Sequence, residues 1–169
     1  METVYFKDIP CQTNGNLPAV GTIAPDFTLV TGDLKEIHAS DYEGKRIVLN
    51  IFPSIDTGVC AASVRRFNQE AASLENTVVI CISMDLPFAQ ARFCAANDIE
   101  NVVTASAFRS PEFVKDYGVE LIDGPLKGLL ARSVLVLDGK REVIYRQLVE
   151  QITDEPDYTA ALNVLKGKF

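Results

Sequence analysis

The sequence predicts an α/β protein with a mixed central sheet, flanked by helices and preceded by an N-terminal β-hairpin. Three observations support this prediction. Short and almost wholly apolar runs, such as 47–52 and 77–83, are typical of strands buried on both faces of a sheet. Segments with apolar residues at helical spacing follow these runs. Near the end of the chain, the apolar segments 133–138 and 142–148 flank Asp138-Gly139-Lys140, which suits a hairpin turn.

The first half of the chain is predicted to contain the hairpin, two strands and one long helix. The polar segment Gln12-Thr13-Asn14-Gly15-Asn16 looks like the hairpin turn, and 26–30 is the strand that follows it. The strand 47–52 ends at Pro53. A helix over 58–74 comes next, with one apolar face formed by Val59, Ala62, Phe67, Ala71 and Leu74.

The second half continues the alternation of strands and helices. The run 77–83 is a strand, and Asp85 followed by Pro87 marks the start of a short helix over 87–96. The later elements are a short strand near 102–103, a helix near 111–117, the strands 133–138 and 142–148, and a helix over 156–166. Strand-helix-strand followed by strand-strand-helix is the thioredoxin-like order of elements. Because no linker, repeat or low-complexity stretch interrupts them, residues 1–169 are expected to form one domain.

Cys60 is the residue with the clearest chemical prediction. It follows the strand 47–52 and is expected in the first turn of the next helix. Cysteine reacts as the thiolate, and an ordinary thiol is only roughly 3% ionised at pH 7. The unpaired backbone N–H groups and the dipole at a helix start favour negative charge. Thr57 can cap this helix and direct its hydroxyl into the same space. We therefore predict that Cys60 is a reactive thiol.

The remaining cysteines are interpreted by their surroundings. A free cysteine among apolar residues is usually a small buried hydrophobe, and this alternative stays open even for Cys60. Cys94 lies near the end of a short helix that can unfold locally at low cost, or it packs as one more apolar contact beside Phe93. Cys81 lies inside an apolar strand and is interpreted as packing. Cys11 lies in a polar N-terminal segment and is assigned no role.

Composition and charge exclude several classes of function. The formal net charge of −7 argues against a nucleic-acid partner, because phosphate contacts need clustered Lys and Arg. No apolar run approaches the ~20 residues that span a bilayer, and the first residues do not form a signal peptide, so a cytoplasmic location is expected. Four cysteines are too few for a disulfide scaffold. The single His38 and the cysteine spacings do not suit a metal site, and without a Gly-rich phosphate motif no cofactor is expected.

The segment around Cys60 resembles a known active-site motif. The loop Pro53-x-x-x-Thr57-x-x-Cys60 resembles that of the peroxiredoxins, and the longer segment 50–65 is similar to the bacterial thiol peroxidase subfamily, atypical two-cysteine peroxiredoxins. The resemblance covers nearly the whole chain, and its motifs in this order are highly specific. Three further segments also resemble that subfamily: 85–94, 124–128 and 155–162.

The resemblance implies a role for each matching residue. Cys60 corresponds to the peroxidatic cysteine, Thr57 to the hydroxyl that hydrogen-bonds peroxide, and Pro53 to the residue that shields the pocket from water. Arg132, just before the strand 133–138, matches the family's active-site arginine. Cys94 matches the resolving cysteine of the subfamily.

The activity implied by this resemblance is thiol-dependent reduction of hydrogen peroxide and organic hydroperoxides. The family mechanism implies a sulfenic acid on Cys60, unwinding of the first helical turn, an intramolecular disulfide with Cys94, and reduction by thioredoxin. The resemblance also implies a homodimer formed through the face around the active site, to which the 124–128 loop contributes. Two other functions remain open. A thioredoxin-type disulfide oxidoreductase is disfavoured because the cysteine spacings contain no C-x-x-C. A redox sensor or holdase would oxidise once, without turnover.

Overall fold

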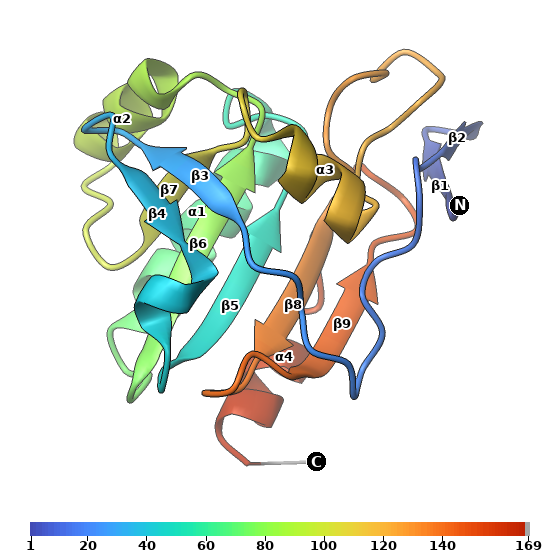
Figure 1. Cartoon of the computed structure of the whole chain (residues 1–169). Coiled ribbons are helices and arrows are strands. Elements are labelled where there is room, and N and C mark those ends of the chain that lie inside the picture. Colours follow the sequence, from blue (N-terminus) through green and yellow to red (C-terminus); the bar gives the residue numbers. More distant parts are fainter. Residues whose placement is uncertain (168–169) are drawn as a thin grey trace.

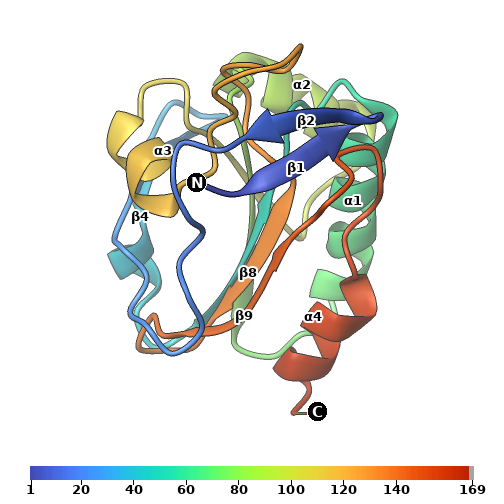
Figure 2. The ribbon, with the colours of Figure 1, turned by 90° about the vertical axis from the view of Figure 1, so that its right-hand side faces the viewer.

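The structure is a computed structural model that describes residues 1–167. In these residues a two-stranded hairpin precedes a seven-stranded mixed sheet with helices on both faces, which confirms the predicted α/β class (Figures 1 and 2). The strands are β1 Thr3–Phe6, β2 Ile9–Gln12, β3 Thr28–Thr31, β4 Glu36–His38, β5 Arg46–Ile51, β6 Thr77–Ser83, β7 Val103–Ser106, β8 Ser133–Leu137 and β9 Val143–Leu148. The helices are α1 Gly58–Ala71, α2 Pro87–Ala96, α3 Pro111–Tyr117, α4 Tyr158–Leu165 and the 3-10 helix η1 Ala39–Tyr42.

The order of strands in the sheet determines which loops meet. The order is β4-β3-β7-β6-β5-β8-β9, with β5, β6 and β7 parallel and the other pairings antiparallel. Ile51, at the end of β5, lies opposite Ser133, at the start of β8. The loop that leaves β5 and the residue that precedes β8 therefore lie at the same edge of the sheet. Ligand sites of open α/β sheets form at this edge, beyond the carboxyl ends of the parallel strands.

Two apolar layers hold the helices on the sheet. Figure 2 shows α1 and α4 on one side of the sheet and α3 on the other. Val48 of β5 is buried with Phe67 of α1, whereas the next residue, Leu49, is buried with Phe113 of α3. Because successive strand residues point to opposite faces, both faces need apolar side chains, and the run 47–52 has them. Each such fully buried side chain stabilises the fold by about 1.5–3 kcal/mol.

The N-terminal hairpin is confirmed, but the turn predicted for it is wrong. The register pairs Phe6 with Ile9, so the turn consists of Lys7 and Asp8. Both residues have positive φ, 52° and 43°, as two-residue hairpin turns of type I′ require. The segment 12–16 instead carries the chain away from the hairpin. Lys7-Asp8 lacks the glycine that usually marks such a turn, which explains why it escaped prediction.

The other differences concern short or polar elements. β4 was not predicted, because Glu36–His38 has no apolar alternation and is a strand only through antiparallel pairing with β3. The 3-10 helix that follows β4 was also missed. α1 ends at Ala71 rather than at 74. α4 begins at Tyr158 rather than at 156, because Asp157 accepts the N–H of Ala160 at 3.0 Å and caps the helix.

Within residues 1–167, no helix has both the length and the apolar character needed to cross a bilayer. The helices are instead amphipathic or short, and their apolar sides face the sheet.

Candidate active site

Cys60 lies in the first turn of α1, where the sequence predicted it. Its side chain is fully buried against the sheet. Thr57 is the N-cap of α1, and its Oγ1 accepts the backbone N–H of Cys60 at 3.3 Å. The Thr57 hydroxyl in turn donates to the carbonyl of Ser54 at 3.2 Å. The cap therefore closes the loop that follows β5 and fixes the start of the helix beside the sulfur.

Arg132 is the charged partner of the Cys60 sulfur. Its side chain is only 2% exposed, and Nη2 lies 3.2 Å from Cys60 Sγ in hydrogen-bonding geometry. Nε donates to the carbonyl of Ile152 at 2.9 Å. The third nitrogen, Nη1, is buried and has no hydrogen-bond partner among the described residues. The guanidinium thus places a fixed positive charge and an N–H donor directly at the Cys60 sulfur.

A cavity of about 280 Å³ opens beside this pair. Pro53, Thr57 and Arg132 line it. The rest of its wall is mainly apolar and comes from the hairpin, from α1 and from the loops before β8 and after β9: Phe6, Val59, Leu126, Leu129 and Ile152. A larger hollow of about 380 Å³ lies by α3, but none of the predicted site residues lines it. We place the chemistry in the smaller cavity because the arginine connects it to Cys60.

Cys94 is not part of this cavity. It lies on α2, is half-buried, and its Sγ is 3.6 Å from the hydroxyl of Thr104 on β7. Burial raises the pKa of the Cys94 thiol above its ordinary value, although the contact with Thr104 opposes this. Both cysteines are free thiols, and each sulfur has a different partner. The structure thus brings four of the five predicted site residues together and leaves Cys94 apart on the neighbouring helix.

The other two cysteines are packed in the interior. Cys81, in the middle of β6, is fully buried and accepts a hydrogen bond from Asn50 Nδ2 at 3.6 Å. Burial raises the pKa of the Cys81 thiol to about 12, so it is protonated at neutral pH. Cys11, in β2 of the hairpin, is fully buried in the cluster that includes Leu121. The position of Cys81 agrees with its interpretation as packing.

Asp85 was missed as a site residue by sequence reasoning. It follows β6, and its carboxylate accepts the N–H of Ile55 at 2.7 Å and the hydroxyl of Ser54 at 2.9 Å. Both groups belong to the loop between β5 and α1. Asp85 therefore holds the segment that carries Pro53 and Thr57. An acidic residue two positions beyond a parallel strand, at the edge where ligand sites form, was the available signal.

The site has no arrangement suited to a metal ion. In residues 1–167, no three or more His, Cys, Asp or Glu side chains are grouped as ligands. The side chains of the site themselves supply a nucleophilic sulfur, a fixed cation and hydrogen-bond donors beside an apolar cavity.

Comparisons with known proteins agree with this geometry. A family model described as Redoxin matches residues 19–162. The thiol peroxidase of Corynebacterium glutamicum is 56% identical over 165 residues, which cover 98% of this chain and 99% of the relative. A crystal structure of a peroxiredoxin-like protein from Aquifex aeolicus has a TM-score of 0.93 at 41% identity, covering 99% of this chain and 97% of that one.

The fold is shared more widely than the sequence. A thiol peroxidase from Chromobacterium violaceum has a TM-score of 0.90 at 23% identity, covering 99% of this chain and 98% of that one. This likeness shows the thioredoxin-like fold. The relative of higher identity and the family model confirm the sequence-based identification as a peroxiredoxin-type peroxidase. The chain belongs to the Redoxin family and, within it, to the thioredoxin-like peroxiredoxins.

Proposed function

We propose that this protein reduces peroxides by direct attack of the Cys60 thiolate on the peroxide O–O bond. The observation that carries the proposal is the buried guanidinium of Arg132. One of its nitrogens contacts Cys60 Sγ at 3.2 Å, and another, Nη1, is buried without a hydrogen-bond partner in residues 1–167. A buried, unsatisfied donor is costly unless a ligand uses it. A peroxide oxygen bound beside the sulfur would accept from this donor.

In the first step, the Cys60 sulfur attacks the terminal oxygen of ROOH. An S–O bond forms and the O–O bond breaks, so the sulfur is oxidised to sulfenic acid and the leaving oxygen departs as RO⁻, which takes up a proton to give ROH or water. Negative charge develops on the leaving oxygen in the transition state. Arg132 is the donor available to stabilise it, and the Thr57 hydroxyl at the cavity adds a second hydrogen bond once its proton turns from the Ser54 carbonyl to the peroxide. Pro53 keeps water out of the cavity.

The cavity wall supports organic hydroperoxides as substrates in addition to hydrogen peroxide. Its lining is largely apolar, with Phe6 and Leu129 among the larger side chains. At about 280 Å³ it has room for an alkyl or aryl group beside the reacting oxygens. An apolar substituent that enters it gains about 25 cal/mol per Å² of surface removed from water. Hydrogen peroxide lacks this contribution.

In the second step, Cys94 condenses with the sulfenic acid. An S–S bond forms between Cys94 and Cys60, and the sulfenic oxygen leaves as water. The two thiols start on different helices with different partners, so the first turn of α1 and the end of α2 must loosen before an S–S bond of about 2.05 Å can form. Exposure of Cys94 removes the burial that raises its pKa, which makes it a better nucleophile. Thioredoxin then reduces the disulfide by thiol exchange.

Two further properties complete the proposal. The protein forms a homodimer through the face around the active site, and the 124–128 loop contributes to it. It works in the reducing cytoplasm, where transient catalytic disulfides are recycled. Size-exclusion chromatography with light scattering tests the dimer: a mass near twice 18.5 kDa is expected, and a monomer at all concentrations would contradict it.

A coupled assay tests the proposed function. Wild-type protein is supplied with thioredoxin, thioredoxin reductase and NADPH, and NADPH oxidation is followed after addition of hydrogen peroxide or cumene hydroperoxide. Continuous turnover with both peroxides, faster for the organic one, is the expected result. A single stoichiometric oxidation without turnover would instead indicate a redox sensor.

A further inference from the structure

The N-terminal hairpin is hydrogen-bonded to the segment that follows β9. The backbone N–H of Tyr5 donates to the carbonyl of Glu150 at 2.8 Å, and the N–H of Ile152 donates to the carbonyl of Tyr5 at 2.9 Å. Below this ladder, Val4 of the hairpin is fully buried in a cluster that includes Ala131 and Ile152. The hairpin is thus tied by two hydrogen bonds and by packing to a segment next to the active site.

Ile152 connects this hairpin directly to the catalytic arginine. Its N–H bonds to Tyr5, while its carbonyl accepts from Arg132 Nε at 2.9 Å. Arg132 then reaches Cys60 Sγ through Nη2 at 3.2 Å. One peptide residue therefore separates the hairpin from the guanidinium that contacts the sulfur. The same hairpin supplies Phe6 to the cavity wall. A shift of the hairpin would move both Arg132 and this wall.

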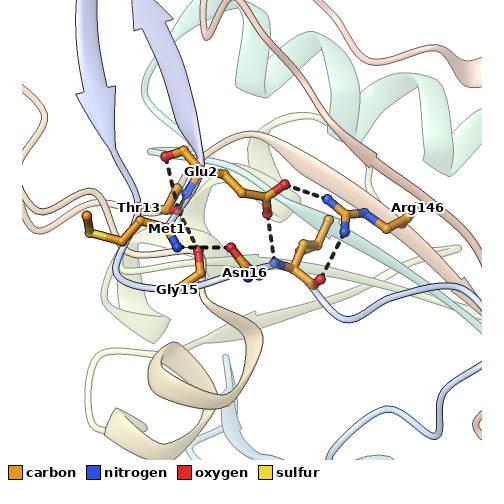
Figure 3. Close-up of polar contacts among 7 residues, drawn as sticks. Met1, Glu2, Thr13, Gly15, Asn16 and Arg146 are labelled. Atoms are coloured by element: carbon orange, nitrogen blue, oxygen red, sulfur yellow. Dashed lines mark hydrogen bonds and ion pairs between the residues drawn. The ribbon is translucent and has the colours of Figure 1, made fainter.

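A second set of polar contacts holds the hairpin at the other end of β1, around Glu2 (Figure 3). Glu2 Oε1 accepts from Arg146 Nη2 at 2.8 Å, and Glu2 Oε2 accepts the N–H of Leu17 at 2.9 Å. Arg146 Nη1 donates to the carbonyl of Leu17 at 3.0 Å, which closes a ring of three contacts. Arg146 belongs to β9, and residues 149–152 follow directly. Both sets of contacts therefore join the hairpin to one continuous segment, from Arg146 to Ile152.

We propose that the Glu2–Arg146 pair is a positioning device for the active site, which holds the hairpin so that Ile152 orients Arg132 and Phe6 closes the cavity. This inference rests on the proposed peroxidase function. The pair is well placed for this role because both side chains are about one quarter exposed, 26% and 27%, and share Leu17 as a third partner. An ion pair that shares a third partner and is partly buried holds its two side chains more firmly in place than a single exposed ion pair does.

The test compares variants of this pair with a matched control. Glu2→Ala, Arg146→Ala and the double variant remove the pair. Glu70→Ala removes the pair between Arg66 and Glu70 on α1. The Glu70 side chain is also 27% exposed, and in residues 1–167 none of its hydrogen bonds or ion pairs is to the hairpin. The rate constant for a single oxidation of Cys60 is measured by stopped flow, with hydrogen peroxide and with cumene hydroperoxide, at a temperature where every variant is folded.

A displacement near 1 Å at a reacting group can cost up to about 10²-fold in rate, so we expect a fall of about tenfold in Glu2→Ala and Arg146→Ala. The fall should be larger with cumene hydroperoxide, because the Phe6 wall moves too. The double variant should match the single variants, since the two residues act as one unit. The Glu70→Ala rate should equal that of the wild type. A lower melting temperature with unchanged rates would reduce the pair to a stability contact and overturn the inference.

A second measurement does not depend on peroxide chemistry. Amide hydrogen exchange at Ile152 should be faster in Glu2→Ala than in wild type, because the bond to Tyr5 opens more often. Unchanged exchange would overturn the positioning role even if activity fell. Conversely, a wild type that consumes no peroxide would contradict the proposed function, while the exchange at Ile152 would still decide whether the pair holds the hairpin.

Discussion

Replacement of Arg132 is the perturbation with the most direct structural consequence. In Arg132→Met the stem keeps much of its packing, but the charge 3.2 Å from Cys60 Sγ is lost. Two unit charges about 4 Å apart attract by ~4 kcal/mol at an effective dielectric of ~20, before desolvation is subtracted. Each ~1.4 kcal/mol of attraction that is lost from the transition state lowers the rate about tenfold. Even a third of the full attraction would therefore be worth about an order of magnitude in the rate of peroxide attack.

The rate should fall for a second reason as well. Nη1 of Arg132 is buried and has no hydrogen-bond partner in the part of the chain that the structure describes, and it is the donor that we assign to the peroxide. Loss of one donor to a developing negative charge commonly costs about 10²–10³ in rate. This loss should remain at a pH high enough to ionise the thiol fully. Arg132→Lys should restore only part of the rate. The guanidinium of arginine directs a rigid fork of N–H donors to the sulfur, the peroxide and the Ile152 carbonyl at once, whereas the ammonium of lysine is a single point charge.

The assay separates the charge of Arg132 from the fixed geometry of its guanidinium. Stopped-flow oxidation by peroxide gives the rate of wild type, Arg132→Met and Arg132→Lys at neutral and at high pH. We expect Arg132→Met to stay slow at both pH values and Arg132→Lys to recover part of the rate. Rates of Arg132→Met equal to those of wild type at both pH values would refute the assigned role of Arg132.

Three further predictions follow from the site. Thr57→Val should slow peroxide oxidation by about 10²–10³ because it removes a hydroxyl at the cavity, and Thr57→Ser should stay near wild type. Cys60→Ser should abolish peroxide consumption, whereas Cys94→Ser should keep one rapid oxidation and lose thioredoxin-driven turnover. Disulfide formation should accelerate as pH rises toward and above ~8.5: burial raises the pKa of Cys94 in the closed helix, so ionisation favours the open helix.

Each of these predictions has an outcome that contradicts it. Normal kinetics in a folded Thr57→Val would leave Thr57 as a helix cap only. Normal turnover of Cys94→Ser with thioredoxin would move the resolving role to another cysteine. The rate of disulfide formation is measured by quenched-flow alkylation between pH 7 and pH 10. A rate that stays constant or falls over this range would show that opening of α2 is not linked to ionisation of Cys94.

The loop around Cys60 could be predicted from sequence because its determinants are local. Pro53 ends a strand, Thr57 caps the helix, and Cys60 falls in the first turn; each depends on neighbours within a few residues. The placement of Arg132 depends on more, namely on the antiparallel pairing of β8 with β5, which puts Ser133 opposite Ile51. The family resemblance identified this arginine, whereas its contact with sulfur required the three-dimensional fold.

The remaining parts of the site depend on contacts that leave little trace in the sequence. Ile152 acts through its backbone carbonyl, which any residue type would provide. Asp85 holds the Pro53–Thr57 loop through a hydrogen bond to Ile55, which lies 30 residues before it in the sequence. The hairpin turn consists of Lys7 and Asp8, whereas the residue pairs favoured in such turns are Asn-Gly, Asp-Gly and Gly-Gly. Such features arise from tertiary pairing, so local propensity could not reveal them.

Peroxide is expected to oxidise the sulfur of Cys60 and no other sulfur of the chain. The most direct measurement treats reduced Cys94→Ser with one equivalent of peroxide in the presence of dimedone, which traps sulfenic acid, and locates the label by peptide mass spectrometry. We predict one label per chain, on Cys60. A label on Cys11 or Cys81, or no label despite peroxide consumption, would contradict the assignment.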